Sequence, residues 1–515
     1  MNPLKYILTS LIMMLSAPGI FATQFFVATN GSDSNTGTID SPYKTITKVL
    51  SLSGTIFKAG DTLYVRGGTY TYTTTINIAK YGTADAVYHI FAYPGERPIL
   101  DFSTMAYNSS NRGITLKGQY CYIKGFDIKG AGDNGINISG SNNIIENCAF
   151  YENRDSGMQL NSAASNNKVI NCDSYYNADP DNYGDADGFS CKMDVGSGNY
   201  FYGCRSWMNV DDGWDGYLRG ADSVSTTIEN CWAFHNGYLK NGVDGGANAN
   251  GQGFKMGGSD DKKLQHNFKL TNCLSFMNKA NGYDQNSNMG SMILYNCTSY
   301  SNKGQSFYLS KDVAAGQVMV VKNCVALGGK MTMIASVQQL TNSWLTGSGA
   351  TDTDFVNIDT TGLGGATAPR KDDGSLPDIT FMHLAKNSKM IDAGTDLGLP
   401  FNGKAPDLGC FETDYLNDVK EGERGKGIMG YNLLQNYPNP FNPTTTIKYE
   451  LNKQGYVKIK VYNIQGRQVA ALVNSIKSAG EHSVKWEAAG QSSGIYFCQL
   501  SVDGLTVVKK MILAK

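Results

Sequence analysis

The sequence of 515 residues has little histidine, proline or charge, and each shortage excludes a class of protein. With 5 histidines, a site built on histidine ligands or a histidine base has few candidates. Charged residues make up 17% and the formal net charge is −1, which argues against a nucleic-acid-binding protein, since such a protein would show a basic face. Beyond the N-terminus no apolar run reaches about 18 residues, so we expect no transmembrane segment.

The N-terminal segment 1–22 has the pattern of a secretory signal peptide. Lys5 precedes an apolar run, and small residues lead to Ala22. We expect cleavage between Ala22 and Thr23 and an exported mature protein. In an exported chain the eleven cysteines would ordinarily predict disulfides, but their spacing indicates another use.

Seven of the cysteines belong to a repeat. Asparagine precedes six of the seven and returns five residues after six of them, at intervals of 24 to 42 residues between cysteines. A period near 24 residues, with short β-prone segments between Asn/Gly turns, predicts a stacked solenoid, best read as a right-handed parallel β-helix. The seven cysteines are Cys148, Cys172, Cys204, Cys231, Cys273, Cys297 and Cys324.

In a stacked solenoid, equivalent positions of successive coils lie about 4.8 Å apart. Each repeated residue therefore forms a column of like side chains that all point the same way. The cysteines should point inward as small apolar side chains, and the asparagines should hydrogen-bond along the stack. A disulfide framework is the alternative, although one stacked column is a poor way to pair seven thiols.

The composition, together with the points at which the repeat begins and ends, divides the chain into domains. We predict an all-β protein with a β-helix domain over 23–415 and a linker over 416–430. An N-terminal capping helix should begin at Ser41 as N-cap and Pro42 as first residue. An irregular cover is expected over 351–412 and a small β-sandwich over 431–515.

The C-terminal part resembles the type A sorting domain of the type IX secretion system. The motifs NYPNPFNP, VYNIQGR and SGIYF carry the resemblance over roughly 85 residues. It implies the secretion machinery as a partner and export across both membranes of a Gram-negative bacterium, followed by release or attachment to the cell surface. A carbohydrate-binding module is the alternative, but the segment shows no aromatic platform.

A second repeated element follows each cysteine and places charged residues together. Its anchors are Gly135, Gly157, Gly188, Gly213, Gly253, Gly282 and Ser306. The residue after each anchor is aromatic or apolar and should face the core, so the residue two after should face solvent. Asp187 and Asp212 then stack in adjacent coils with Asp211 and Asp215 beside them, and Lys255 stands one coil beyond Asp215.

Four carboxylates this close repel one another unless a cation neutralises them. Hard oxygen donors suit Ca²⁺ rather than zinc. Insertions of 7 and 13 residues before Gly188 and Gly253 flank the cluster, as the walls of a groove would. A structural calcium site, or a solvated acidic patch with a surface Lys–Asp pair, remains the alternative.

A divalent cation and a lysine on a β-helix fit β-elimination of a uronic acid polymer. The cation binds the sugar carboxylate and the lysine removes the C5 proton. A neighbouring cation and partial burial would lower the pKa of this lysine, so we expect a mildly alkaline optimum.

The runs DADGFSCK, NVDDGWDGYL and GQGFKMGG resemble polysaccharide lyase family 9, the pectate and related lyases. The resemblance extends over roughly 25–412. It implies an acidic plant polysaccharide as substrate, either polygalacturonate or rhamnogalacturonan. It also implies catalytic Ca²⁺ held by Asp187, Asp211, Asp212 and Asp215, with Lys255 as the base.

Two further functions stay open at this point. A polygalacturonase-like hydrolase would use paired aspartates without calcium or a lysine base. A non-catalytic surface adhesin would be indifferent to loss of Lys255. We expect a monomer.

Other residues near the site receive weaker predictions. His235 and His266 are expected to be plain surface histidines, and Cys191 to be buried and inert. Lys192, Arg219 and Lys240 lie near the cluster in the sequence and could meet substrate carboxylates, but a solvated role fits each of them as well.

Overall fold

A computed structural model describes residues 22–345, 349–413, 431–434, 436–451, 454–463, 468–502 and 505–513. Nearly all of the expected signal peptide and the whole expected linker lie outside these residues. The chain divides into two compact units between Thr413 and Asp414. Each unit is described by itself.

The first unit contains three parallel sheets, which we call sheets A, B and C. Sheet A consists of β1 (Gln24–Val27), β2 (Thr62–Val65), β5 (Tyr88–Ala92), β8 (Cys121–Lys124), β11 (Ile144–Glu146), β14 (Lys168–Ile170), β17 (Asn199–Tyr202), β20 (Val224–Glu229), β23 (His266–Thr271), β26 (Met292–Tyr295), β29 (Met319–Lys322) and β32 (Gln338–Leu340). Sheet B consists of β3 (Gly68–Thr71), β6 (Pro98–Asp101), β9 (Asp127–Lys129), β12 (Ala149–Tyr151), β15 (Asp173–Tyr175), β18 (Arg205–Trp207), β21 (Trp232–Phe234), β24 (Leu274–Phe276), β27 (Thr298–Tyr300) and β30 (Val325–Leu327). Sheet C consists of β4 (Ile76–Ile78), β7 (Ile114–Leu116), β10 (Ile136–Ile138), β13 (Met158–Leu160), β16 (Phe189–Cys191), β19 (Trp214–Asp215), β22 (Phe254–Lys255), β25 (Tyr283–Asp284), β28 (Gln305–Leu309) and β31 (Lys330–Met333).

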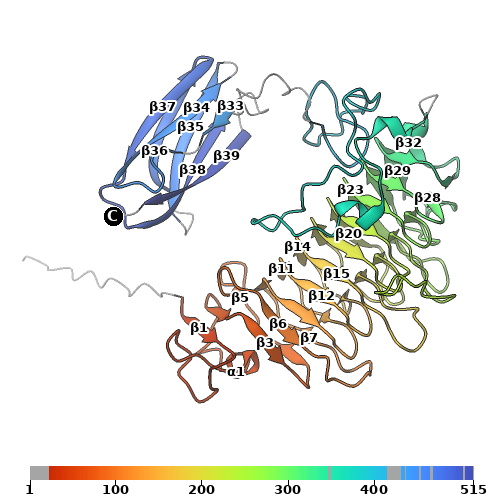
Figure 1. Cartoon of the computed structure of the whole chain (residues 1–515), viewed down its shortest axis with the longest axis horizontal. Coiled ribbons are helices and arrows are strands. Elements are labelled where there is room, and N and C mark those ends of the chain that lie inside the picture. The colour runs from red at the N-terminus through yellow and green to blue at the C-terminus, as the bar shows by residue number, and fades with distance from the viewer. Residues whose placement is uncertain are drawn as a thin grey trace, which may run out of the picture. The chain divides into compact units, whose positions relative to one another are not determined.

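The chain visits the sheets in the order A, B, C, and every strand pairs with the equivalent strand one coil away. In Figure 1 the colour changes steadily from coil to coil along this unit. The predicted right-handed parallel β-helix is therefore confirmed, and it gives each repeated residue a neighbour above and below in the stack.

The interior is filled by the cysteine column and by aromatic side chains. Each of the seven cysteines of the repeat is at most 1% exposed. All eleven cysteines of the chain are free thiols, which excludes the disulfide framework. Phe189, Trp214 and Phe254 stack in successive coils with ring centroids 4.9 Å apart, so the glycine-anchored column also faces the core as predicted.

The two asparagine columns have different roles. The column five residues after the cysteines forms the predicted ladder, in which each side-chain amide donates to the next one at 2.7 to 3.1 Å; its members are Asn153, Asn177, Asn209, Asn236, Asn278 and Asn302. The column directly before the cysteines instead turns the corner from sheet A to sheet B. Its asparagines have φ between 51° and 55°, a left-handed conformation that asparagine tolerates well. The side-chain oxygens of Asn147, Asn171 and Asn296 accept no hydrogen bond from any residue that the structure describes, so the prediction that this column is also a ladder is wrong.

The N-terminal helix is shorter and begins later than predicted. Helix α1 (Ile46–Ser51) has Thr45 as its N-cap, and the Thr45 side chain accepts a hydrogen bond from Lys48 N at 3.2 Å. Tyr43 pairs with Val27 in a β-bridge, which keeps the segment around Pro42 extended. The helix buries Ile46 and Val49 against the first coils, as a cap should.

Beyond sheet B an irregular segment covers the later coils. It contains the short 3-10 helices η1 (Ser343–Leu345), η2 (Asp352–Asp354) and η3 (Thr361–Gly365). Phe381 packs on the ring of Phe276 at 4.7 Å, and the guanidinium of Arg370 pairs with Asp173 at 2.7 Å. Through these contacts the irregular segment buries part of the outer face of sheet B.

The second unit is antiparallel. One sheet contains β33 (Tyr431–Leu433), β34 (Thr444–Leu451) and β37 (Gly480–Glu487), and the other contains β36 (Gln468–Lys477), β35 (Gly455–Asn463), β38 (Gly494–Val502) and β39 (Leu505–Leu513). Trp486, Val461 and Leu500 lie in its core. Across the described ranges of both units, the helices are too short or too polar to cross a bilayer.

Candidate functional site

Three adjacent strands of sheet C position the charged residues predicted for the site. Asp215 pairs with Ser190 in the coil before it and with Lys255 in the coil after it. Asp187 and Asp212 lie directly before the glycines that lead into β16 and β19. Those glycines have no room for a side chain: a Cβ on Gly213 would meet the carbonyl oxygen of Gly253 at 2.5 Å.

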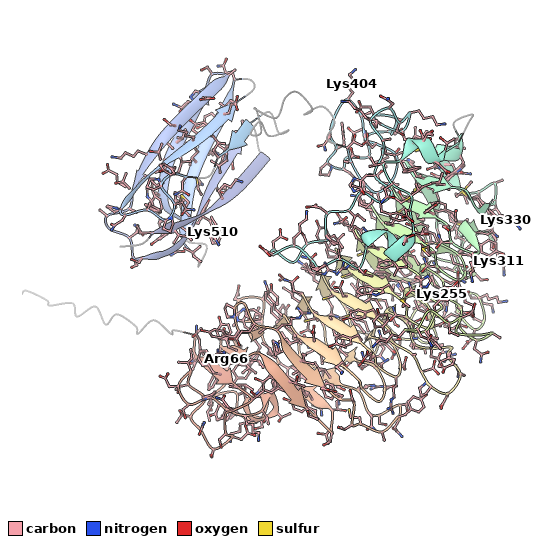
Figure 2. All side chains as sticks on the ribbon, viewed as in Figure 1. Arg66, Lys255, Lys311, Lys330, Lys404 and Lys510 are labelled. Atoms are coloured by element: carbon pink, nitrogen blue, oxygen red, sulfur yellow. The ribbon has the colours of Figure 1, made fainter. Side chains whose placement is uncertain are left out.

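Strand alternation explains why the polar residues leave the core. Because Phe189, Trp214 and Phe254 point inward, Ser190, Asp215 and Lys255 point outward. The expectation that this column faces solvent is nevertheless wrong, since Asp215 is 6% exposed and the Lys255 side chain is 12% exposed. Figure 2 shows Lys255 at the side of the β-helix, among its middle coils.

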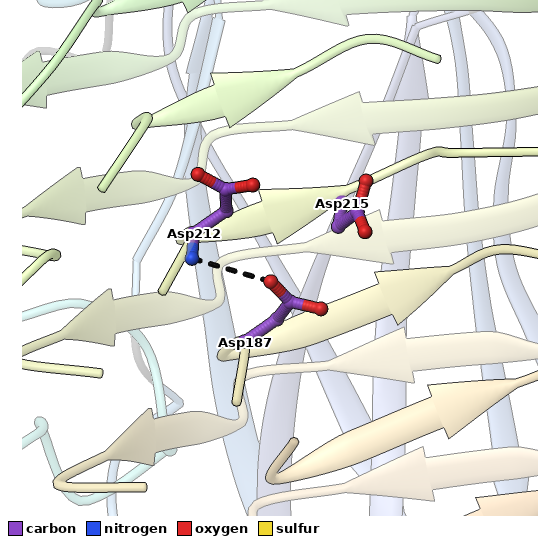
Figure 3. A group of neighbouring side chains, drawn as sticks. All are labelled: Asp187, Asp212 and Asp215. Atoms are coloured by element: carbon purple, nitrogen blue, oxygen red, sulfur yellow. Dashed lines mark hydrogen bonds between the residues drawn. The ribbon is translucent and has the colours of Figure 1, made fainter. Parts of the chain in front are cut away.

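Three carboxylates meet at this position. Asp187, Asp212 and Asp215 each offer an oxygen such that all three oxygens lie within 4.8 Å of one another. Figure 3 shows them at the starts and ends of neighbouring strands, joined by a hydrogen bond from Asp212 N to Asp187 Oδ1 of 3.2 Å. Asp187 and Asp212 are both fully buried.

Asp211 lies beside this group without being one of the three. Its Oδ1 accepts a hydrogen bond from Asn250 N at 2.5 Å, and Asp212 Oδ1 accepts one from Gln252 N at 2.7 Å. Both donors come from the longer of the two insertions, which therefore contacts the cluster. Ala249 of that insertion belongs to a small buried apolar cluster with Ala186 of the other insertion and Val210.

Two lysines pair with the carboxylates. Lys255 Nζ lies 2.9 Å from Asp212 Oδ2 and 3.4 Å from Asp215 Oδ1. Lys192 Nζ lies 2.7 Å from Asp187 Oδ2 and 3.7 Å from Asp215 Oδ2. The sequence reasoning gave Lys192 no definite role, although the period of two along β16 places it on the same outward face as Ser190.

Burial and mutual repulsion shift the pKa values of the acids. Burial raises the pKa of Asp212 to about 7, against the opposing effect of Lys255, and the charges of Asp187 and Asp215 add to the rise. Burial and the neighbouring Asp212 also raise the pKa of Asp211. For Asp215, burial is outweighed by Lys255 and Lys192, which lower its pKa.

The ion pairs with these carboxylates also shift the pKa values of the two lysines. Burial alone would lower the pKa of Lys255, but the carboxylates of Asp212 and Asp215 outweigh it and raise the pKa well above its ordinary value. The pKa of Lys192 is raised in the same way, chiefly by Asp187. Both lysines are therefore ammonium groups when only side chains neutralise the cluster.

The residues fit a divalent cation. All donors are carboxylate oxygens, the hard ligands that Ca²⁺ prefers. Asp212 Oδ2 is buried and lies 2.9 Å from the ammonium group of Lys255, so this oxygen already faces a positive charge at the position where a cation would bind. When ionised, the four aspartates exceed the two lysines by two negative charges, which is the charge of one such cation.

Other residues singled out from the sequence lie elsewhere. His266 is wrongly predicted as a surface residue: it is fully buried, its Nδ1 donates to the Gly216 carbonyl at 2.8 Å, and Thr226 Oγ1 lies 2.8 Å from its Nε2. His235 is half-buried and stacks on Tyr238. Cys191 is buried as expected.

Two basic residues near the cluster in sequence are paired away from it. Arg219 Nε lies 3.2 Å from Asp260 Oδ2, and Lys240 forms an ion pair with Glu152. Both side chains are more than half exposed.

Two family models match the chain. Residues 25–329 match the model described as Pel9A-like, right handed beta helix region. Residues 435–514 match the secretion system C-terminal sorting domain. The first match contains all of the cluster and the second lies within the antiparallel unit.

Known proteins resemble the chain along most of its length. It is 38% identical to pectate lyase L of Dickeya chrysanthemi over 398 residues, which is 75% of this chain and 90% of that protein. It is 39% identical to pectate lyase L of Paenibacillus polymyxa over 399 residues, which is 73% of this chain and 85% of that protein.

Two solved structures share the fold. The crystal structure of pectate lyase Pel9A superposes with a TM-score of 0.69 and 36% identity, over 77% of this chain and 98% of that chain. A rhamnogalacturonan lyase superposes with a TM-score of 0.61 and 27% identity, over 71% of this chain and 97% of that chain.

Proposed function

The chain belongs to the Pel9A-like right-handed β-helix family and is a polysaccharide lyase; on that basis we propose that it cleaves pectate, a galacturonate polymer, by β-elimination. The observation that carries the proposal is the contact between an amine and an acidic cluster. Lys255 Nζ lies 2.9 Å from Asp212 within the group of buried carboxylates. Such a pairing supplies a base and a cation site within one sugar's reach.

In this proposal Asp187, Asp211, Asp212 and Asp215 hold Ca²⁺. A bound divalent cation neutralises the sugar carboxylate and stabilises the negative charge that develops when C5 loses its proton. The hydrogen bonds from Asn250 N and Gln252 N fix Asp211 and Asp212 before substrate arrives, so little reorganisation is needed. The three buried carboxylates support the assignment.

Lys255 is the proposed base. Its Nζ accepts the C5 proton, the C–H electron pair forms the C4–C5 double bond, and the glycosidic oxygen on C4 leaves with its bonding electrons and gains a proton from solvent. To accept a proton the amine must first be neutral. Because the carboxylates raise its pKa when they are free to pair with it, we expect turnover to increase with pH into the mildly alkaline range.

The sorting domain supports a proposal about location. A secretion system C-terminal sorting domain at 435–514 indicates export, and we infer the type IX route to the cell surface or the medium. A secreted lyase would meet an acidic plant polysaccharide that is too large to enter the cell.

One assay tests the proposed function. The mature protein is incubated with polygalacturonate and with rhamnogalacturonan, with calcium or with a chelator, and ultraviolet absorbance of the unsaturated product is followed. We expect absorbance to rise with polygalacturonate and calcium. A rise with rhamnogalacturonan alone would favour the second candidate, which the rhamnogalacturonan lyase structure supports. Reducing ends without the chromophore would indicate hydrolysis and overturn the proposal.

A further inference from the structure

Lys192 is a second ammonium group inside the acidic cluster, and neither the fold nor the proposed base accounts for it. Its side chain is 7% exposed. Its Nζ lies 2.7 Å from Asp187 Oδ2 and 3.7 Å from Asp215 Oδ2, and thus bridges carboxylates of two coils. A lysine is rarely buried to this extent without a compensating role.

Hydrogen bonding alone does not explain Lys192. Asp187 Oδ2 already accepts from Ser190 Oγ at 2.8 Å, and Asp187 Oδ1 accepts from Asp212 N at 3.2 Å. Both oxygens of this carboxylate therefore have a donor without the lysine. Lys192 Nζ also donates to Asp187 Oδ2 at 2.7 Å and to the Asp185 carbonyl oxygen at 3.5 Å, and what it adds beyond these bonds is its positive charge.

The charge matters because the substrate is an anion. With the four aspartates ionised and one divalent cation bound, the two lysines bring the net charge of these seven groups to zero, and Asp155, whose charge also acts on Lys192, adds a negative charge when it is ionised. Without Lys192 the same groups would carry one more negative charge. Each extra negative charge opposes the approach of a polymer that has a carboxylate on every sugar.

We propose that Lys192 is a positioning residue that serves as the permanent counter-charge of the cluster and allows a polyanionic substrate to bind there. The proposal rests on the proposed function. It implies that Lys192 acts in opposite directions on the two ligands, since its charge repels the metal cation and favours the acidic polymer. A purely structural lysine would affect both in the same direction.

The test uses Lys192→Gln, which keeps a hydrogen-bond donor but removes the charge. Calcium binding is measured by calorimetry without substrate, and KM and kcat are measured on polygalacturonate. We expect the calcium Kd to fall by about tenfold and KM to rise by about tenfold, with a smaller change in kcat. Lys192→Arg, which keeps the charge, should remain close to wild type in both measurements.

Lys240→Gln is the matched control, because it removes an exposed lysine that pairs outside the cluster, and it should change neither constant. If Lys192→Gln does not fold, Lys192→Met is measured in its place. Weaker binding of both ligands, or no change in either, would overturn the proposal while leaving the proposed function intact. A wild-type protein that neither binds calcium nor forms unsaturated product would refute the proposed function itself, and this inference with it.

Discussion

Asp212→Asn should change how the stability of the calcium-free protein depends on pH. Asp212 is fully buried, and its pKa is raised to about 7, first by burial and then by Asp187 and Asp215. Asparagine has nearly the same shape, and its amide oxygen can still accept the hydrogen bond from Gln252 N. The substitution therefore removes the titration and keeps the hydrogen bond from Gln252 N, and it replaces the oxygen that pairs with Lys255 Nζ by an uncharged amide group.

The sign follows from proton linkage. A carboxyl whose folded pKa lies above its unfolded value of about 3.8 binds its proton more tightly in the native state. Its effect on the free energy of unfolding is absent below about pH 4 and grows more destabilising as pH rises to about 7. A rise of the pKa from about 3.8 to about 7 corresponds to about 4 kcal/mol in the free energy of unfolding.

The assay is thermal unfolding followed by circular dichroism between about pH 4 and pH 8 after calcium has been removed. For the roughly 390 residues of the β-helix unit, about 2.1 cal/mol/K per residue converts 4 kcal/mol into about 5 °C. Wild type and Asp212→Asn should melt at similar temperatures near pH 4, and the variant should melt about 5 °C higher near pH 8. Added calcium should narrow or reverse this difference in melting temperature, since the variant has lost one of the proposed calcium ligands.

Asp215→Asn provides a control of opposite sign from the same cluster. Lys255 and Lys192 outweigh burial and lower the pKa of Asp215, so its ionised form stabilises the fold above about pH 4. The Asp215→Asn protein should therefore melt below wild type near pH 7. Parallel melting curves for wild type and Asp212→Asn across the pH range would refute the reasoning.

Three further predictions concern the solenoid. Asn236→Ala breaks the buried amide ladder and should lower the free energy of unfolding, measured in urea or by heating, by about 2 to 4 kcal/mol. Asn241→Ala, in an exposed loop, should change it by no more than about 0.5 kcal/mol. Equal effects of the two substitutions would show that the ladder is dispensable. Gly213→Ala forces a Cβ to 2.5 Å from the Gly253 carbonyl oxygen, while Gly54→Ala meets nothing within 4 Å. Only the first should lower Tm and weaken calcium binding, and a normal Gly213→Ala protein would contradict the close approach of the coils. Finally, the folded protein should resist thiol reagents and the denatured protein should expose eleven thiols; fewer would reveal a disulfide.

The stacking of the coils could be predicted from the sequence because the repeat is carried by side chains with one physical role each. Cysteine and the residue after each anchor glycine must fit the interior, so their periods define the coils. The same register placed Asp187, Asp212, Asp215 and Lys255 in neighbouring coils. The predicted helix start at Pro42 failed because a tertiary contact, the bridge from Tyr43 to Val27, overrides the local capping preference.

Burial at the site could not be predicted from alternation alone. Alternation separates inward from outward positions, but it does not show what covers the outward face. The insertion that carries Asn250 and Gln252 donates backbone hydrogen bonds to Asp211 and Asp212, a contact that alternation does not encode. His266 was misjudged because its partners Gly216 and Thr226 lie 50 and 40 residues earlier in the chain, separations that no local motif encodes. Lys192 was underestimated although its nearest partner, Asp187, lies only five residues before it.

The most direct test of the central claim compares Lys255→Met with wild type in two measurements on the same samples. Calcium binding is determined by calorimetry, and release of unsaturated product from polygalacturonate is followed at saturating calcium. The account predicts that Lys255→Met still binds calcium and produces no unsaturated product. Substantial product formation by this variant would contradict the assignment of the base and with it the mechanism.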